Sequence, residues 1–244
     1  APKGEVGSPI SEPLYAQPSN LALQVALTRA WRARGLEPHA IVGHSVGEVG
    51  AAWAAGVLEL REAFRLTWHR CRLQQPMVGT SSMMAVGAPT NVIAPLLSDY
   101  PGLEIAAYNS PEALTLSGPR DALETFGELL KSRGVFHRML KVDVAYHSKQ
   151  MESMRAAFLE AIADLDAHPP QIPLYSTVLG ARIDAQMQRP DYWWRNVLEP
   201  VRLRDAVAQL GRDGFDTFLE VGPNPVLGFS IRQTLTDTSA LPAT

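Results

Sequence analysis

A serine lies between two glycines in the segment Gly43-His44-Ser45-Val46-Gly47-Glu48. An apolar run, Ala40-Ile41-Val42, precedes this segment, and a helix-like stretch from Val49 to Leu58 follows it. A serine at such a strand-to-helix turn is an exposed nucleophile, because the glycines leave room for the tightly turned backbone. The backbone N–H of Val46 and the positive end of the following helix would stabilise charge that develops on a substrate carbonyl oxygen. The pattern predicts nucleophilic catalysis by Ser45.

A nucleophilic serine needs a base, and the ordinary pKa of histidine suits that role at neutral pH. The sequence has six histidines. His44 adjoins the serine, but neighbours in a tight turn point in different directions, so we interpret it as a wall of the site. His147 lies in Val144-Ala145-Tyr146-His147-Ser148, at a junction between two predicted units where a cleft would form. His147 is therefore the predicted base, although a hydrogen-bonded structural histidine is the ordinary interpretation for any one of the six.

An arginine falls on the apolar side of a predicted helix, Arg61 to Leu73, when its residues are placed at about 100° intervals. A buried guanidinium without an anion would cost several kcal/mol, so Arg70 must find a partner. One interpretation is an internal pair with an Asp or a Glu. The other is a fork that holds a substrate carboxylate through two parallel hydrogen bonds. The apolar arc around Arg70 is made up of Ala63, Phe64, Leu66, Trp68, Cys71 and Leu73.

The elements that must position these residues fall into two sets. For the first set, the pattern predicts a helix from Ser19 to about Arg34 with Gly35 as its stop, and a helix from Glu59 to Met77 with a break at Pro76. Later in the chain it predicts a helix over 150–165 and short strands at Ile172–Thr177 and Thr217–Val221.

The second set lies between these elements and reads strand, helix, strand, strand, helix, strand, which is the ferredoxin-like order. The predicted ranges are 83–87, 91–97, 103–108, 113–117, 120–133 and 135–142. The fold class is therefore predicted as α/β. An α/β-hydrolase-like main domain with a parallel sheet is expected from residues 1–81 and 146–244, and an inserted ferredoxin-like α+β subdomain from residues 82–145.

Length and composition limit the classes of protein to consider. With 244 residues and 46% apolar content, the chain can form one large core and a smaller one. A net charge of −3 gives no basic field for nucleic acid, and no apolar run reaches the roughly 18 residues that cross a bilayer. We therefore expect a cytoplasmic protein with no nucleic-acid or membrane partner. Cys71 is the only cysteine, so neither an internal disulfide nor a thiolate metal cluster is expected.

With these residues in view, the chain resembles the acyltransferase domains of polyketide synthases and, more distantly, the malonyl-CoA:acyl carrier protein transacylases of fatty acid synthesis. The resemblance covers about Leu14 to Leu235. Besides the serine segment, it rests on Tyr15-Ala16-Gln17-Pro18, Arg70-Cys71-Arg72-Leu73, Met84-Ala85-Val86, Asn109-Ser110-Pro111, Leu116-Ser117-Gly118, Ala145-Tyr146-His147-Ser148, Tyr192-Trp193-Trp194-Arg195-Asn196, Glu199-Pro200-Val201-Arg202 and the segment from Glu220 to Leu227.

This resemblance implies a ping-pong acyl transfer with no bound cofactor. Ser45 would take the acyl group from an acyl-CoA substrate, and the phosphopantetheine thiol of an acyl carrier protein would accept it, with His147 as base and then acid. Asn196 would orient His147, Arg70 would hold the free carboxylate of a malonyl-type unit, and Asn109 would line the pantetheine channel. A ketosynthase and other synthase domains would be adjacent partners.

The residues before the catalytic histidine bear on the choice of acyl unit. Val144-Ala145-Tyr146-His147 matches in full neither His-Ala-Phe-His, which the malonyl-selective domains of the family carry, nor Tyr-Ala-Ser-His, which the methylmalonyl-selective ones carry. The ring of Tyr146 should crowd an α-methyl branch, and the aliphatic Val46 also resembles the malonyl set. Malonyl-CoA is therefore the expected substrate, with methylmalonyl-CoA as the alternative and core packing as the plainer interpretation of Tyr146. His44, Val144, Tyr146 and Asn109 are expected to contact the substrate beside Arg70.

Two other functions use the same residues. A serine hydrolase or thioesterase would share the serine turn, with water in place of the carrier thiol. A non-catalytic lobe could merely dock carrier proteins. The sequence also departs from the family at its start, because only 44 residues precede Ser45 and none of them contains the Gly-Gln-Gly motif whose glutamine region helps to form the oxyanion hole. We therefore expect a truncated chain, a fragment, or a missing strand that lies elsewhere.

Overall fold

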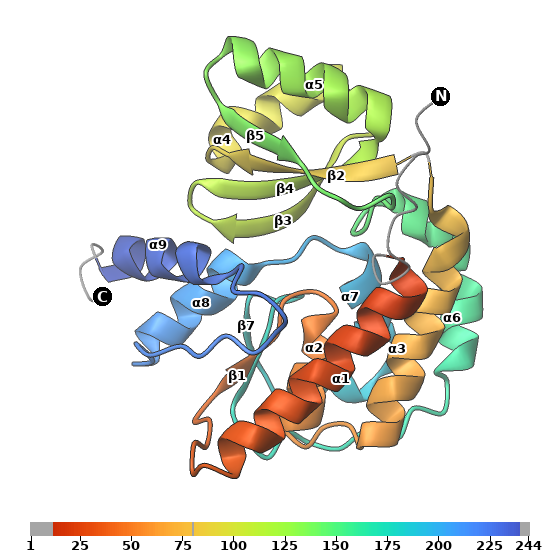
Figure 1. Ribbon diagram of the computed structural model, residues 1–244, viewed down its shortest axis with the longest axis vertical. Coiled ribbons are helices and arrows are strands. Elements are labelled where there is room, and N and C mark those ends of the chain that lie inside the picture. Colours follow the sequence, from red (N-terminus) through yellow and green to blue (C-terminus); the bar gives the residue numbers. More distant parts are fainter. Residues whose placement is uncertain (1–11, 80, 240–244) are drawn as a thin grey trace, which may run out of the picture.

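The chain forms two sheets that belong to two units (Figure 1). The computed structural model describes residues 12–79 and 81–239. The main unit has a three-stranded sheet in the order β1-β6-β7, and the small unit has a four-stranded sheet in the order β3-β4-β2-β5. The strands are β1 (Ile41–Val42), β2 (Ser81–Gly87), β3 (Glu104–Ser110), β4 (Ala113–Pro119), β5 (Phe136–Met139), β6 (Leu174–Ser176) and β7 (Ala181–Ile183).

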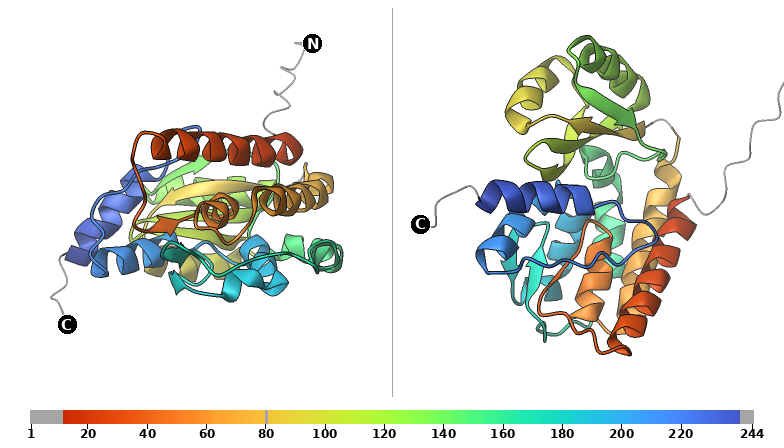
Figure 2. Two further views of the ribbon diagram at one scale, coloured as in Figure 1. Left: turned by 90° about the horizontal axis from the view of Figure 1, so that it is seen from below. Right: turned by 60° about the vertical axis from the view of Figure 1, so that its left-hand side comes forward.

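Helices surround the sheet of the main unit. In the left view of Figure 2, the red helix α1 runs along one side of the molecule and the blue helix α8 lies on the opposite side. The helix α2 contacts β1 and β6, whereas α8 contacts β6 and β7. The helices are α1 (Pro13–Arg32), α2 (Gly47–Ala54), α3 (Leu60–Gln74), α6 (Arg155–Ala161), α7 (Pro190–Leu198), α8 (Leu203–Arg212) and α9 (Gly228–Ser239), with 3₁₀ turns at Gln75–Met77, Lys149–Met154 and Gln186–Gln188.

The small unit has its own hydrophobic core beneath the helix α5 (Arg120–Ser132). Leu123, Phe126 and Leu130 recur on one face of α5 and are fully buried against the sheet, as the helical period requires. The other helical segments are α4 (Thr90–Ile93) and a 3₁₀ turn at Ala94–Asp99. The elements of this unit follow the predicted order, and its sheet is antiparallel throughout.

The two units are joined by two chain crossings that lie next to each other. Ser82 Oγ donates to the carbonyl oxygen of Val142 over 2.8 Å, and the Ala145 N–H donates to Ser81 Oγ over 3.0 Å. The right view of Figure 2 shows the dark blue helix α9 between the small unit and the lower part of the main unit. Both α8 and α9 contact β3, so the inserted unit is also packed against the end of the chain.

Four predictions about the main unit need correction. Its sheet is mixed and not parallel, because β6 pairs parallel with β1 but antiparallel with β7. Helix α1 begins at Pro13, not at Ser19, since Pro13 suits the first helical turn and Pro18 is accommodated inside the helix. The helix expected over 150–165 is a 3₁₀ turn followed by the short α6. The ends of the expected 1–81 and 146–244 unit lie outside the described residues.

The fourth correction concerns Thr217–Val221, which is not a strand. Among the described residues, no strand pairs with this segment, and Leu219 in its centre is 50% exposed. The segment therefore lacks both the inter-strand hydrogen bonds and the side-chain burial that stabilise a strand. A 3.4 Å hydrogen bond from the Gln24 side chain to the Val221 carbonyl links this segment to α1. Within the described ranges, no helix combines the length and the apolar character needed to cross a membrane.

Candidate active site

Ser45 lies in a strained turn between β1 and α2. Its φ angle is +54°, in the left-handed region that non-glycine residues rarely adopt. The turn is closed by hydrogen bonds from the Gly47 N–H to the His44 carbonyl at 2.9 Å and from the Glu48 N–H to the Ser45 carbonyl at 3.0 Å. A Cβ atom at Gly43 would lie 2.5 Å from the Cα of Glu48, which explains the glycine before the serine. The sequence prediction of an exposed serine turn agrees with this geometry.

His147 meets the serine hydroxyl, as the sequence predicted. Its Nε2 lies 2.6 Å from Ser45 Oγ, and its Nδ1 lies 2.8 Å from the carbonyl oxygen of Glu199. A carbonyl oxygen only accepts hydrogen bonds, so Nδ1 carries the proton and Nε2 presents its lone pair to the serine. His147 also has a left-handed φ of +56°. The pair is therefore arranged for proton transfer from Ser45 to His147.

The role expected for Asn196 is wrong. Among the described residues, no hydrogen bond joins its side chain to His147, whose Nδ1 is held by the Glu199 backbone three residues later. Asn196 Oδ1 instead accepts a hydrogen bond from Arg70 Nη1, while Nδ2 donates to the Ser45 carbonyl at 3.1 Å and to Glu48 Oε2 at 2.8 Å. The sequence could not distinguish these arrangements, because a turn of helix separates Asn196 from the backbone group that meets the histidine.

Burial, the positive charge of Arg70 and the nearby His44 together lower the pKa of the His147 imidazole to about 3, against the hydrogen bond to Glu199. His147 is 4% exposed. The imidazole is therefore neutral at physiological pH, which is the state that a general base needs.

Arg70 is buried, as its place in the apolar arc of α3 predicted, and its guanidinium lies beside the serine. Its Nη2 donates to Ser45 Oγ at 3.3 Å, and its Nε has no hydrogen-bond partner. Burial lowers the pKa of this guanidinium to about 10, so it stays charged at neutral pH. Among residues 12–79 and 81–239, no Asp or Glu forms an ion pair with Arg70. Of the two interpretations of this residue, the internal ion pair is excluded for the described part of the chain.

Glu48 is a residue of this site that sequence reasoning missed. It lies in the first turn of α2, where a carboxylate is favoured by the helix dipole. It is, however, fully buried and its carboxylate accepts hydrogen bonds from four groups of Thr177, Tyr192 and Asn196. Burial raises the pKa of the Glu48 carboxyl, and these hydrogen bonds oppose the rise. The sequence near Ser45 gave no indication that Glu48 would be buried among these hydrogen-bond donors.

The backbone N–H of Val46 has no hydrogen-bond partner in the described part of the chain. It lies at the N-cap of α2, immediately after the nucleophile, where the unpaired N–H groups of a helix gather. This is the place at which the sequence predicted an oxyanion donor.

His44 connects the serine turn to the small unit. Its Nε2 lies 3.0 Å from Asn109 Oδ1 on β3, and Asn109 Nδ2 donates to Thr115 Oγ1 on β4 over 3.0 Å. Burial lowers the pKa of the His44 imidazole, and the Asn109 hydrogen bond opposes this. Both residues were expected at the substrate, and the structure places them together at the boundary between the two units.

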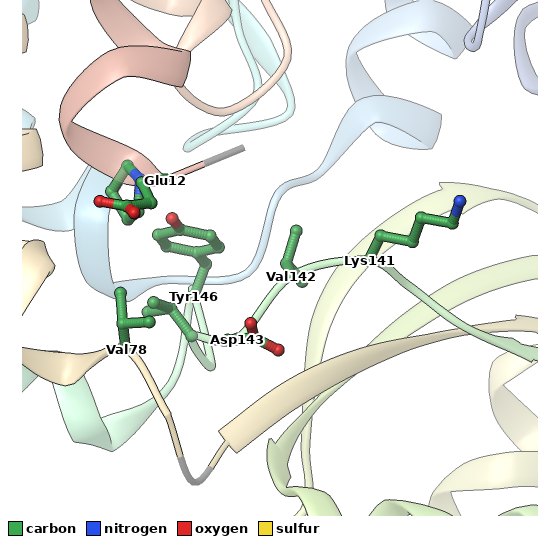
Figure 3. Close-up of a pocket in the computed structure, with 8 residues that line it drawn as sticks. Glu12, Val78, Lys141, Val142, Asp143 and Tyr146 are labelled. Carbon is green, nitrogen blue, oxygen red and sulfur yellow. The ribbon is translucent and has the colours of Figure 1, made fainter. Parts of the chain in front are cut away.

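Val144 and Tyr146 line a small cavity of about 60 Å³ beside the site (Figure 3). Glu12, Val78 and Lys141 also contribute to its wall, but Ser45, His147 and Arg70 do not. Figure 3 shows the Tyr146 ring between Glu12 and the segment around Asp143. Burial raises the pKa of the Tyr146 hydroxyl, and the charge of Arg70 opposes this rise, so the ring is electrostatically linked to the guanidinium. Of Val144 and Tyr146, it is therefore Tyr146 that both lines the cavity and interacts electrostatically with Arg70.

Comparisons with known proteins agree with this geometry. Residues 11–244 match the family described as acyl transferase domain. Erythronolide synthase EryA3 from Saccharopolyspora erythraea is 39% identical over 242 residues, which cover 96% of this chain and 7% of that protein. Across three polyketide synthase relatives, the chain spans between 4% and 7% of their length.

Two solved structures extend the likeness to the fold. The acyltransferase domain from module 8 of the salinomycin polyketide synthase gives a TM-score of 0.92 at 31% identity, over 96% of this chain and 56% of that one. An acyl carrier protein S-malonyltransferase from Vibrio cholerae gives a TM-score of 0.85 at 29% identity, over 93% of this chain and 77% of that one.

Proposed function

The chain belongs to the acyl transferase domain family in the form found in polyketide synthases, and from this premise we propose which acyl group it transfers and how. It moves a malonyl-type group from coenzyme A to the phosphopantetheine thiol of an acyl carrier protein, through an acyl intermediate on Ser45. The observation that carries this proposal is the position of Arg70, a buried cation 3.3 Å from Ser45 Oγ with no acidic partner among the described residues.

The first half of the reaction forms an ester and breaks a thioester. Ser45 Oγ attacks the thioester carbon while His147 Nε2 takes the hydroxyl proton. The carbonyl oxygen becomes an oxyanion, which the Val46 N–H and the N-terminus of α2 stabilise. When the C–S bond breaks, coenzyme A leaves as its thiol with the proton from His147. In the second half, the carrier thiol gives its proton to His147 and its sulfur attacks the ester carbon. The ester C–O bond then breaks, and His147 returns the proton to the departing Ser45 Oγ.

A free carboxylate on the acyl group helps this proton transfer. Arg70 is the largest cause after burial that keeps the pKa of His147 low, because its positive charge opposes an imidazolium nearby. A malonyl carboxylate bound to the guanidinium would neutralise that charge just when His147 must accept a proton. A monocarboxylic acyl group would leave Arg70 buried and unpaired, which selects against it.

The preferred acyl unit is malonyl, because the half-buried Tyr146 ring leaves less room for an α-methyl branch next to Arg70. The reaction needs acyl-CoA and a phosphopantetheinyl carrier protein as substrates, and no bound cofactor. A carrier protein and an adjacent ketosynthase would be its partners. The polyketide synthase names of the relatives support this assignment, as does the malonyltransferase name of the Vibrio cholerae neighbour.

We also propose that the domain division is functional, with residues 82–145 as a ferredoxin-like subdomain set into an α/β-hydrolase-like core of residues 1–81 and 146–244. The separate hydrophobic clusters of the two units support this division. The substrate site then lies between them, where His44 of one unit meets Asn109 of the other.

The proposal is tested by intact-protein mass spectrometry after incubation with malonyl-CoA. We expect one added malonyl group on the native chain and none on Ser45→Ala, because the acyl group is carried by Ser45 Oγ. Ser98→Ala, at an exposed serine, is the matched control and should be acylated normally. Release of coenzyme A beyond the one equivalent that accompanies acylation of Ser45 should also depend on a carrier protein. Release at an equal rate without a carrier would indicate a hydrolase, and absence of label on the native chain would leave only a docking function.

A further inference from the structure

Glu48 is a buried carboxylate whose surroundings are polar and specific. It is 0% exposed, and its Oε1 accepts hydrogen bonds from the Thr177 N–H and, at 3.0 Å, from Thr177 Oγ1. Its Oε2 accepts one from the Tyr192 hydroxyl at 2.8 Å and one from Asn196 Nδ2 at 2.8 Å. A buried carboxylate is costly unless its oxygens are satisfied, and here each oxygen has two donors. No step of the acyl transfer described above uses this residue.

The Asn196 amide joins Glu48 to Arg70. Its Nδ2 lies between two acceptors, the Glu48 carboxylate and the Ser45 carbonyl, and both of its hydrogens are used. The amide orientation is therefore determined, because the opposite orientation would place the oxygen against two acceptors. The oxygen in turn faces the guanidinium and accepts a hydrogen bond from Arg70 Nη1. One amide thus lies between a buried anion and a buried cation.

We propose that Glu48 is a positioning residue that holds the Arg70 guanidinium in place through Asn196, and thereby determines the preference for an acyl group with a free carboxylate. This inference rests on the proposed function. Glu48 orients Asn196, and Asn196 then fixes one side of the guanidinium. The other side stays directed at Ser45 Oγ and at the substrate carboxylate. The charge of Glu48 balances that of Arg70 without an ion pair that would occupy the fork.

The change Glu48→Gln tests this chain of contacts at nearly constant volume. A glutamine amide has two N–H donors where the carboxylate had an acceptor oxygen, so it cannot accept from all four surrounding donors. Asn196 then loses the contact that fixes its amide. If the amide rotates, its Nδ2 meets the guanidinium, and Arg70 shifts. A displacement of about 1 Å in a positioning group can cost on the order of 10²-fold in rate.

The experiment compares kcat/KM for acylation of Ser45 by malonyl-CoA and by acetyl-CoA, which has no free carboxylate. In Glu48→Gln we expect the malonyl-to-acetyl ratio to fall by about 10- to 100-fold. The control is Glu59→Gln, the same chemical change at an exposed glutamate whose side chain makes no capping hydrogen bond to α3, and this variant should keep the native ratio. In an Arg70→Ala background, Glu48→Gln should lower the malonyl-to-acetyl ratio no further, because Glu48 acts on this ratio only through Arg70.

Each result decides a separate claim. If the native chain is not acylated by malonyl-CoA, the proposed function fails. If the native chain is acylated and Glu48→Gln keeps the native ratio, the inference about Glu48 alone is overturned. A further fall of the ratio in the Arg70→Ala background would overturn the route through Arg70. Should circular dichroism show that Glu48→Gln does not fold, Asn196→Ala removes the same link, and an unchanged ratio in that variant overturns the inference.

Discussion

Ser45 lies between a neutral base and a positive charge, and each affects what the other can do. The cation lowers the pKa of His147, while the histidine directs the serine oxygen at the substrate. A nucleophile in such surroundings reacts best with a substrate that brings its own negative charge. In the function proposed above, selectivity for dicarboxylic acyl groups would come from electrostatics, whereas the choice among those groups would depend on space near Tyr146.

The change Tyr146→Ser tests that second choice. Removing the ring should open space for an α-methyl group, and we expect the ratio of methylmalonyl to malonyl acylation of Ser45 to rise by about tenfold, since one methyl is worth about 1–3 kcal/mol. Competition between the two acyl-CoA substrates, read by intact mass, gives the ratio. Tyr15→Ser, at a tyrosine that is 50% exposed, is the control. A ratio that stays constant would mean that Tyr146 only packs the core.

At the scale of elements, β1 and α2 present the nucleophile through a turn with no spare room. The carboxyl ends of the parallel strands β1 and β6 lie side by side. The Thr177 hydroxyl, after β6, lies 2.9 Å from the Gly43 carbonyl oxygen and 3.0 Å from Glu48 Oε1, so its one hydrogen is shared between these two acceptors. The candidate catalytic groups gather at this edge because the loops after parallel strands meet there.

Gly43→Ala should destabilise the fold. Its Cβ would lie 2.5 Å from Glu48 Cα and 2.6 Å from the Gly47 carbonyl carbon, and backbone atoms cannot move aside as a flexible side chain can. We expect a loss of about 1–3 kcal/mol in the free energy of unfolding, typical of overpacking, or more. Urea denaturation measures this. Gly222→Ala is the control, because a Cβ at Gly222 meets nothing within 4 Å. Equal stability of the two variants would contradict the steric argument.

Some elements could be predicted from sequence and others could not, for physical reasons. The helix α5 was predictable because Leu123, Phe126 and Leu130 repeat at the helical period, and the end of α1 because Gly35 takes a φ of +84°. Thr217–Val221 has strand-like residues, but a strand also needs a neighbour, which local sequence does not show.

The same difference applies to the site. Ser45 and Arg70 could be found because a motif and a helical arc mark them, and both lie where predicted. The partner of His147 could not, because it is a backbone carbonyl, which any residue type can supply. The role of Glu48 depends on Thr177 and Asn196, which are more than a hundred residues away along the chain.

At the scale of the whole molecule, the half-buried His44 and the buried His147 lie where the two units meet, and desolvation lowers the pKa of each below its ordinary 6.5. The unfolded chain takes up protons at these groups as the pH falls below about 6.5, but the folded chain does so only near their lowered pKa values. Stability from this source is therefore complete above pH 6.5 and is lost as the pH falls toward about 3. Glu48 acts in the opposite direction, since its pKa is raised.

Urea unfolding at pH 7.5 and pH 5 measures this dependence. The native chain should lose stability on acidification, and His147→Gln should lose less, because it removes one group whose pKa differs between the two states. The expected difference is about 1.4 kcal/mol per pH unit below 6.5. The comparison with His147→Gln separates this effect from that of Glu48. His168→Gln, at an exposed histidine, should behave like the native chain. If His147→Gln also behaves like the native chain, this histidine is not held neutral by burial.

The two crossings between the units bear on how this protein could be re-engineered. The chain leaves the main unit at Ser81 and returns by Ala145, and these residues are linked by a 3.0 Å hydrogen bond. An exchangeable module has this geometry, because a graft with closely spaced ends needs no new linker. Asn109 limits such an exchange, because it belongs to the small unit and its side chain forms the hydrogen bond of His44, which lies beside Ser45. A transplanted module would therefore have to carry an acceptor at that position to keep the recipient's serine turn intact.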